Sequence, residues 1–234
     1  MHFDKFPDHI TSVSSKIERR GIKAESFERL FYNAELLEEQ FDERKHIDQG
    51  KSGEIWIASS PSISQGVCMK TIHTEGKSAN TLEKEYEMQS LFYDAGVRVP
   101  MPFAFSRWWK EDGMFNEHLA MEFLQGQNLS DLLSDLLSHK QGITGRDWLR
   151  VTEDLRTQID VANRAGLYHR DLDPKNVFLR GMEKQVYLID FGDSKRTSSQ
   201  DEHEIYETAG RNFSRDNSVI QHINRLVLKA KVLS

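Results

Sequence analysis

The residues with the clearest potential for chemistry lie in the second half of the chain. The segment His169-Arg170-Asp171-Leu172-Asp173-Pro174-Lys175-Asn176 places a carboxylate and an amide five residues apart, and Asp190 begins an Asp-Phe-Gly triplet 14 residues beyond Asn176. One carboxylate can orient and deprotonate an attacking hydroxyl group, while an amide oxygen and a second carboxylate hold Mg²⁺ against phosphates. The pattern therefore predicts phosphoryl transfer, with Asp171 as the base and with Asn176 and Asp190 as metal ligands.

A long helix and a hairpin are expected to position these groups. Apolar residues at helical spacing over 148–162 predict a helix that ends near Gly166, just before the segment with Asp171. The apolar runs 177–179 and 186–190 predict a hairpin that returns Asp190 toward Asn176. Two other helices are expected in this half, one capped by Asn128 and one over residues 219–227.

The first half of the chain predicts a small, mainly antiparallel sheet. One helix interrupts it, from about Ala79 to Ala95, and Gly96 is its expected end. Another amphipathic helix is expected over residues 25–41, before the sheet. The strands are expected around Ile47 and at 55–57, 67–69, 103–105 and 118–123.

Composition excludes several classes of protein. With 31 Lys and Arg against 37 Asp and Glu, the net charge of −6 argues against a general nucleic-acid-binding scaffold, which needs a basic excess. A single cysteine, Cys68, excludes an internal disulfide and a thiolate-rich metal site. The N-terminus lacks the pattern of a signal peptide, and no apolar run is long enough for a transmembrane segment. We therefore expect a cytoplasmic protein.

The motifs H-R-D-L-x-P-x-N and D-F-G resemble the signature set of the protein-kinase-like fold. The resemblance implies a lysine at the end of an apolar strand, which Val67-Cys68-Met69-Lys70 supplies, and a glutamate on the following helix to pair with it. Glu85 is preferred because it lies beside the apolar face of that helix, with Glu83 and Glu87 as competitors. Lys70 would then bind the α- and β-phosphates of ATP, and Glu85 would fix the position of the ammonium group.

The same resemblance implies the rest of a nucleotide site. The segment 48–55 matches a glycine-rich phosphate-covering loop only from its second glycine onward. Met121 would be the gatekeeper residue, and the backbone of Glu122 and Leu124 would meet the edge of adenine. The ATP-binding positions implied in this way are Gly50, Gly53, Ile55, Cys68, Lys70, Glu85, Met121, Glu122 and Leu124.

The chain also departs from the pattern of large protein kinases. Asp173 stands where serine/threonine kinases usually carry a lysine, no A-P-E-like segment follows Asp-Phe-Gly, and only 42 residues follow Gly192. A shortened second lobe resembles that of RIO-type kinases and of lipopolysaccharide-core sugar kinases, and Gly50–Trp56 and Ala95–Pro100 resemble the RIO-type group in particular. RIO proteins usually replace the arginine of H-R-D by a small residue, whereas Arg170 is retained. Autophosphorylation within Ser194–Ser199 is a hypothesis.

These observations together predict an α+β, two-lobed protein-kinase-like fold. The expected parts are an N-terminal helical extension (1–43), a lobe with an antiparallel sheet and one main helix (44–124), and a shortened helical lobe (125–234). The expected activity is ATP- and Mg²⁺-dependent transfer of the γ-phosphate to a hydroxyl group, most simply that of a protein serine or threonine. The alternatives are a small-molecule or lipopolysaccharide-core sugar acceptor, and a pseudokinase that acts as a scaffold.

Overall fold

The computed structural model describes residues 43–50, 53–60, 63–74, 82–109, 115–138 and 145–197, together with five positions between 218 and 225. Its chain divides into two compact units. Unit 1 takes residues 1–86 and 101–123, and unit 2 takes residues 87–100 and 124–234. The helix expected over 25–41 lies outside the described residues, as does nearly all of the expected N-terminal extension. The lobe ranges 44–124 and 125–234 stay a prediction.

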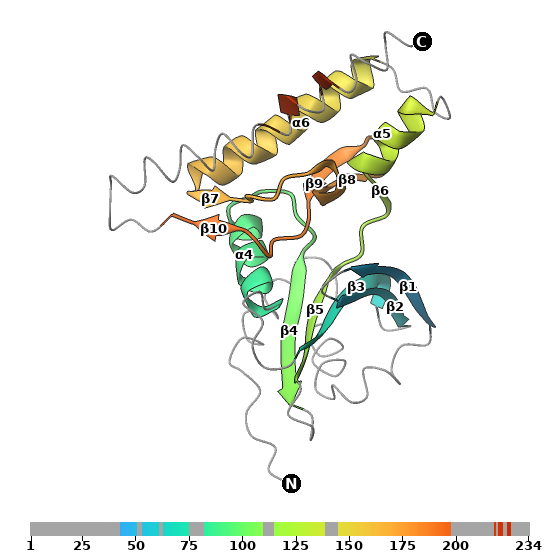
Figure 1. Ribbon diagram of the computed structural model, residues 1–234, viewed down its shortest axis with the longest axis vertical. Coiled ribbons are helices and arrows are strands. Elements are labelled where there is room, and N and C mark those ends of the chain that lie inside the picture. The colour runs from blue at the N-terminus through green and yellow to red at the C-terminus, as the bar shows by residue number, and fades with distance from the viewer. Residues whose placement is uncertain are drawn as a thin grey trace. The chain divides into compact units, whose positions relative to one another are not determined.

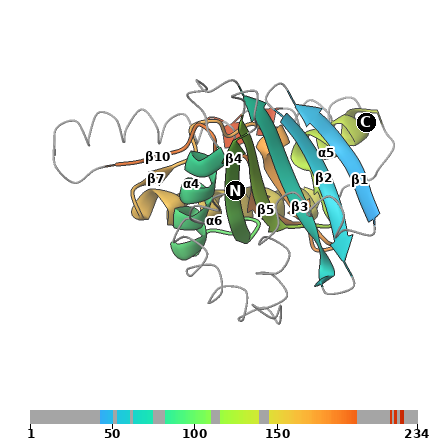
Figure 2. The same cartoon turned by 90° about the horizontal axis from the view of Figure 1, so that it is seen from below.

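Unit 1 contains the antiparallel sheet expected from the sequence. The strands lie side by side in the order β1-β2-β3-β5-β4, as Figure 2 shows. Buried apolar side chains occur on both faces of β3, with Val67 and Met69 on one face and Ile72 on the other. A strand that is buried on both faces has a continuous apolar run in its sequence instead of an alternation of polar and apolar residues. The five strands are β1 (Glu43–Gly50), β2 (Gly53–Ser60), β3 (Ile63–Thr74), β4 (Pro102–Trp109) and β5 (Phe115–Glu122).

Helix α4 (Leu82–Asp94) connects β3 to β4, and its first turn belongs to unit 1. It confirms the helix expected between the strands, although residues 79–81 lie outside the described part of the chain. The helix is followed by a turn at Gly96, whose φ of 85° suits a residue without a Cβ atom. The N–H of Val97 donates back to the carbonyl of Phe92 at 3.1 Å. Its buried apolar side chains are Leu82, Tyr86, Met88 and Phe92.

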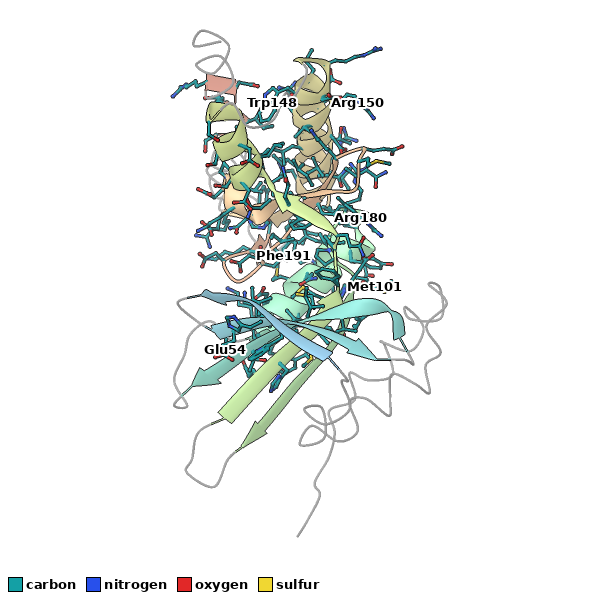
Figure 3. The ribbon with its side chains drawn as sticks, turned by 90° about the vertical axis from the view of Figure 1, so that its right-hand side faces the viewer. Glu54, Met101, Trp148, Arg150, Arg180 and Phe191 are labelled. Atoms are coloured by element: carbon teal, nitrogen blue, oxygen red, sulfur yellow. The ribbon has the colours of Figure 1, made fainter. Side chains whose placement is uncertain are left out.

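The helices of unit 2 are α5 (Leu129–Leu137) and α6 (Gly145–Arg164). Asn128 caps α5 as expected, since its side-chain oxygen accepts the N–H of Asp131 at 2.8 Å. Along α6, Trp148 is buried in the core of the unit while Arg150 faces solvent (Figure 3). The α6 helix packs against β7 and β9, and the apolar stripe predicted over 148–162 is the side that makes this packing.

Two small sheets complete unit 2 (Figure 1). One consists of β6 (Gly126–Asn128), β8 (Val177–Arg180) and β9 (Gln185–Leu188), and the other pairs β7 (Leu167–Tyr168) with β10 (Lys195–Arg196). The β8–β9 hairpin is the expected one. Its second strand ends at Leu188 and not at Asp190, because Asp190 has a φ of 66°, which no strand residue adopts. Strands of two or three residues, such as β6, β7 and β10, are too short to show a period in the sequence.

The segment 97–100 is hydrogen-bonded to both α6 and β9 within unit 2. The N–H of Arg98 donates to the Gln158 side-chain oxygen at 2.8 Å, and its guanidinium group pairs with Asp154. The second oxygen of Asp154 accepts the N–H of Val186 at 2.9 Å, and the N–H of Leu188 donates to the carbonyl of Arg98 at 3.0 Å. These bonds fix the end of β9, which leads directly to Asp190.

Of the expected last helix, only a few positions are described, and Ile220 among them is buried against the core of unit 2. Among the described helices, none combines the length and the apolar character needed to cross a membrane.

Replacing Gly126 by alanine should destabilise the protein strongly. A Cβ atom at this position would lie 2.0 Å from the carbonyl oxygen of Leu179, so β6 and β8 would have to separate. We expect the free energy of unfolding, measured by urea denaturation, to fall by about 3 kcal/mol. Gly181→Ala is the matched control, because Gly181 has a φ of 67° but no atom within 4 Å of the added carbon, and it should cost only about 1 kcal/mol. Equal losses in the two variants would contradict the steric argument.

Candidate active site

Lys70 and Glu85 form a close ion pair in unit 1. The Nζ atom of Lys70, on β3, lies 2.9 Å and 2.8 Å from the two carboxylate oxygens of Glu85, on the first turn of α4. The side chains are only 18% and 5% exposed, so water screens the attraction weakly. The partner expected for Lys70 is therefore present. Glu83 is half-buried and Glu87 is exposed on the same helix.

The register of the sheet gathers four predicted nucleotide-site residues on one face. Ile55 lies opposite Lys70 in the β2–β3 pair, and Met121 lies opposite Cys68 in the β3–β5 pair. Directly opposite residues share a face of an antiparallel sheet, as do residues two apart on one strand. Ile55, Cys68, Lys70 and Met121 therefore project from the same face.

The other predicted nucleotide contacts are backbone groups. Gly50 and Gly53 pair with one another where β1 and β2 meet, and Lys51 and Ser52 between them lie outside the described residues. The N–H of Glu122 donates to the carbonyl of Met101 at 2.9 Å, which limits any backbone contact of Glu122 with a ligand to its carbonyl oxygen. Leu124 is buried and belongs to unit 2.

Asp171 and Asn176 are bonded to each other in unit 2. The amide nitrogen of Asn176 donates to the backbone carbonyl of Asp171 at 2.7 Å and to its carboxylate at 3.0 Å. Both amide hydrogens are thus directed at Asp171, and the amide oxygen is the atom of Asn176 suited to a cation. Asp173, one departure from the kinase pattern, accepts the N–H of Lys175 at 3.1 Å and caps the short 3₁₀ turn Pro174–Asn176.

Asp190 is held beside this pair by backbone bonds. The N–H of Ile189 donates to the carbonyl of Asn176 at 3.0 Å. This bond holds the backbone just before Asp190 next to the backbone of the buried residue Asn176. Asp190 has the left-handed φ of 66°, which costs a non-glycine residue of order 1 kcal/mol and persists only where the surroundings impose it. Oxygen atoms from Asn176 and Asp190 are the donors that a hard divalent cation prefers. The two residues and Asp171 thus come from one compact part of unit 2.

His169 links the two loops that carry these residues. Its Nε2 atom lies 2.9 Å from the carbonyl oxygen of Ile189, so this nitrogen carries the proton that is donated. The hydroxyl group of Ser194 donates to the carbonyl of His169 at 3.2 Å. The two residues that bond to His169, Ile189 and Ser194, therefore lie before and after Asp190 in the sequence. The His169 ring also packs against Phe191, with ring centroids 5.1 Å apart.

Ser194 is itself fully buried. A hydroxyl group in this position cannot accept a phosphate without unfolding the loop, so Ser194 is removed from the autophosphorylation hypothesis. Thr197 is half-buried, and its N–H donates to the carbonyl of Gly166 at 2.9 Å. Ser198 and Ser199 lie outside the described residues.

Sequence reasoning missed the buried carboxylate Glu117 of unit 1, and it treated Ser194 of unit 2 only as a candidate for phosphorylation. Glu117 is a fully buried carboxylate on β5, and its side-chain oxygen accepts the N–H of Leu82 at 2.7 Å. A signal was present for Glu117, because it shares the parity of Leu119 and Met121 along the strand. A charged residue at a core-facing position requires a specific partner.

Comparison with known proteins gives one family. The family model described as "Protein kinase domain" matches residues 41–214. Similar proteins include the serine/threonine-protein kinase PksC of Streptomyces coelicolor, 22% identical over 63% of this chain and 27% of its own length. The serine/threonine-protein kinase greatwall of Xenopus tropicalis is 27% identical over 68% of this chain and 17% of its own length.

A third relative is the KEOPS complex subunit Bud32 of Pyrococcus abyssi, which is 34% identical over 42% of this chain and 37% of its own length. The chain spans less than a third of the length of the first kinases that it matches.

Lowering the pH should destabilise the protein through His169. Burial lowers the pKa of His169 from its ordinary value near 6.5, since the charged imidazolium is disfavoured in the core, and the bond to Ile189 opposes this only partly. The unfolded chain then binds the proton first, so stability is lost as the pH falls below about 6.5, by at most about 1.4 kcal/mol per pH unit.

Urea unfolding between pH 7.5 and 5 measures this effect. His169→Gln keeps a donor for Ile189 and removes the titration, so its unfolding free energy should fall less steeply with acid than that of the wild type. Parallel pH dependences in the two proteins would contradict the assignment to His169.

Cys68 should resist alkylation in the folded protein. Burial raises the pKa of its thiol to about 12, against the opposing charge of Lys70. At pH 8 the thiolate fraction is then roughly 1,000-fold lower than for an ordinary thiol, and iodoacetamide should react correspondingly slowly. Because the chain has one cysteine, intact mass reports the reaction directly. The same protein in urea should react at the rate of a free thiol, and equal rates in the two conditions would contradict the raised pKa of the folded thiol.

Proposed function

The chain belongs to the protein kinase family, and from this membership we propose that it transfers the γ-phosphate of ATP, with Mg²⁺, to the hydroxyl group of a protein serine or threonine. The observation that carries the proposal is the ion pair of Lys70 with both oxygens of Glu85. A lysine at the end of β3, fixed by a helix glutamate, is the group that kinases use to hold the α- and β-phosphates of ATP.

Each residue has a proposed role in this reaction. Asp171 accepts or orients the proton of the attacking hydroxyl group, and its contact with the amide of Asn176 holds the carboxylate in place. Asn176 and Asp190 would hold Mg²⁺, which would neutralise charge on the phosphates. Lys70 binds the phosphates, and Glu85 fixes Lys70. Most of the rate enhancement comes from positioning and charge neutralisation, because phosphoryl transfer needs little covalent help from the protein.

The remaining predicted residues would hold the rest of the nucleotide. Backbone groups of Gly50 and Gly53 would cover the phosphates. The backbone of Glu122 and Leu124 would meet the edge of adenine. The apolar walls would come from Ile55, Cys68 and Met121, and the shared face of Ile55, Cys68 and Met121 with Lys70 supports this assignment.

The resemblance of Gly50–Trp56 and Ala95–Pro100 to RIO-type sequences supports a place among the small atypical kinases. Two of the relatives described above are named as serine/threonine-protein kinases, which favours a protein acceptor. A cytoplasmic location and the absence of general nucleic-acid binding remain proposals made from the sequence.

Removing the carboxylates proposed for the chemistry should abolish transfer. With radiolabelled ATP, Mg²⁺ and general protein acceptors, Asp171→Asn and Asp190→Asn should each lower kcat at least about 100-fold. Asparagine tolerates the left-handed φ that Asp190 adopts, so the second variant should keep its fold. Asp173→Asn is the matched control, because asparagine also caps the 3₁₀ turn, and it should transfer phosphate within about threefold of the wild type.

The same assay separates the alternatives. Transfer that survives both Asp171→Asn and Asp190→Asn would refute the proposed roles. Label on a lipopolysaccharide-core sugar, with none on any protein, would replace the protein acceptor by a sugar. Binding of ATP without transfer or hydrolysis by the wild type would favour a scaffold over an enzyme.

A further inference from the structure

Glu117 occupies an unusual position for a carboxylate. It lies on β5, is fully buried, and accepts the N–H of Leu82, the first residue of α4, at 2.7 Å. Burying a carboxylate is costly unless hydrogen bonds compensate it. The first N–H groups of a helix have no acceptor inside the helix, and they lie at the positive end of the helix dipole. A negatively charged carboxylate is therefore a favourable acceptor for them.

The sheet register places Glu117 close to the ion pair. In the β3–β5 pair, Lys70 lies opposite Leu119 and Ile72 lies opposite Glu117. Lys70 and Glu117 therefore project from the same face on neighbouring strands, two positions apart. The first turn of α4 is bonded to this face at both residues, through the N–H of Leu82 to Glu117 and through the carboxylate of Glu85 to Lys70.

We propose that Glu117 is a positioning residue that holds the first turn of α4 so that Glu85 remains bonded to Lys70. Leu82 and Glu85 are three residues apart, less than one helical turn, so fixing the backbone at Leu82 fixes the point from which the Glu85 side chain extends. The two-oxygen contact with Lys70 leaves little room for a shift of that turn. The expected effect on activity rests on the function proposed above, whereas the effect on the helix does not.

Hydrogen exchange of the full-length protein tests the structural part without any substrate. In Glu117→Ala, amide exchange in peptides covering residues 82–89 should become at least about tenfold faster, because the helix loses its N-terminal acceptor. Peptides from α6 should keep their wild-type rates, which excludes global unfolding. In Glu117→Gln the amide oxygen can still accept from Leu82, so exchange should stay close to that of the wild type. Unchanged exchange in Glu117→Ala would overturn the proposal, whatever the activity.

Kinetics test the functional part. Glu117→Ala should lower kcat for phosphoryl transfer about tenfold and leave the KM for the acceptor unchanged, and Glu117→Gln should restore most of the rate. The matched control is Glu87→Gln, which neutralises an exposed carboxylate of the same helix and should change neither exchange nor kcat. If Glu117→Ala and Glu117→Gln lower kcat equally, the hydrogen bond to Leu82 is not the cause of the loss, and the proposal is overturned.

A double-mutant cycle separates positioning from general stability. If Glu117 acts through Glu85, adding Glu117→Ala to Glu85→Gln should lower kcat by less than twofold further. The full tenfold loss in that background would show that Glu117 acts by another route and would overturn the proposal. If the wild type transfers no phosphate at all, the proposed function fails, and the exchange measurements still decide the role of Glu117 in the helix.

Discussion

The ion pair of Lys70 and Glu85 constrains how the first turn of α4 lies against β3 in unit 1. Two opposite charges with little exposure to water are stable only when their geometry is good, because each charge has lost most of its hydration. That geometry joins a strand to a helix 15 residues further along the chain. The sheet register that aligns Lys70 with Leu119, and the bond from Leu82 to Glu117, are the features that keep the two charges together.

In unit 2, hydrogen bonds between uncharged groups hold the backbone around Asp190. Asp190 adopts a backbone conformation that a non-glycine residue does not favour, and bonds to its sequence neighbours impose it. His169 accepts from Ser194 and donates to Ile189, and the carbonyl of Asn176 accepts from Ile189. Burial lowers the pKa of His169 and so favours the neutral ring, because a charged imidazolium is disfavoured in the core. The residues proposed for chemistry in unit 2 are thus positioned by a network of hydrogen bonds that includes the buried residues His169, Asn176 and Ser194.

Most regular elements of the described chain could be predicted from the sequence. Apolar spacing was sufficient for α4 and α6, and Asn128 marked the start of α5 because a side-chain cap is a local signal. The end of β9 was predicted two residues too late. The apolar run continues through Ile189 to Asp190, but the turn at Asp190 is imposed by contacts with other segments and leaves no local signature.

The sequence by itself determined the catalytic residue types and their spacing, because motifs such as His-Arg-Asp and Asp-Phe-Gly are contiguous in the chain. It ranked Glu85 above Glu83 and Glu87 as the partner of Lys70, because a helix has a predictable apolar face. Only the tertiary structure decided that Asp173 caps a turn, that Ser194 is buried, and that Glu117 bonds to α4. The last two depend on which distant backbone groups meet a side chain, and folding brings those groups together from segments far apart in the sequence.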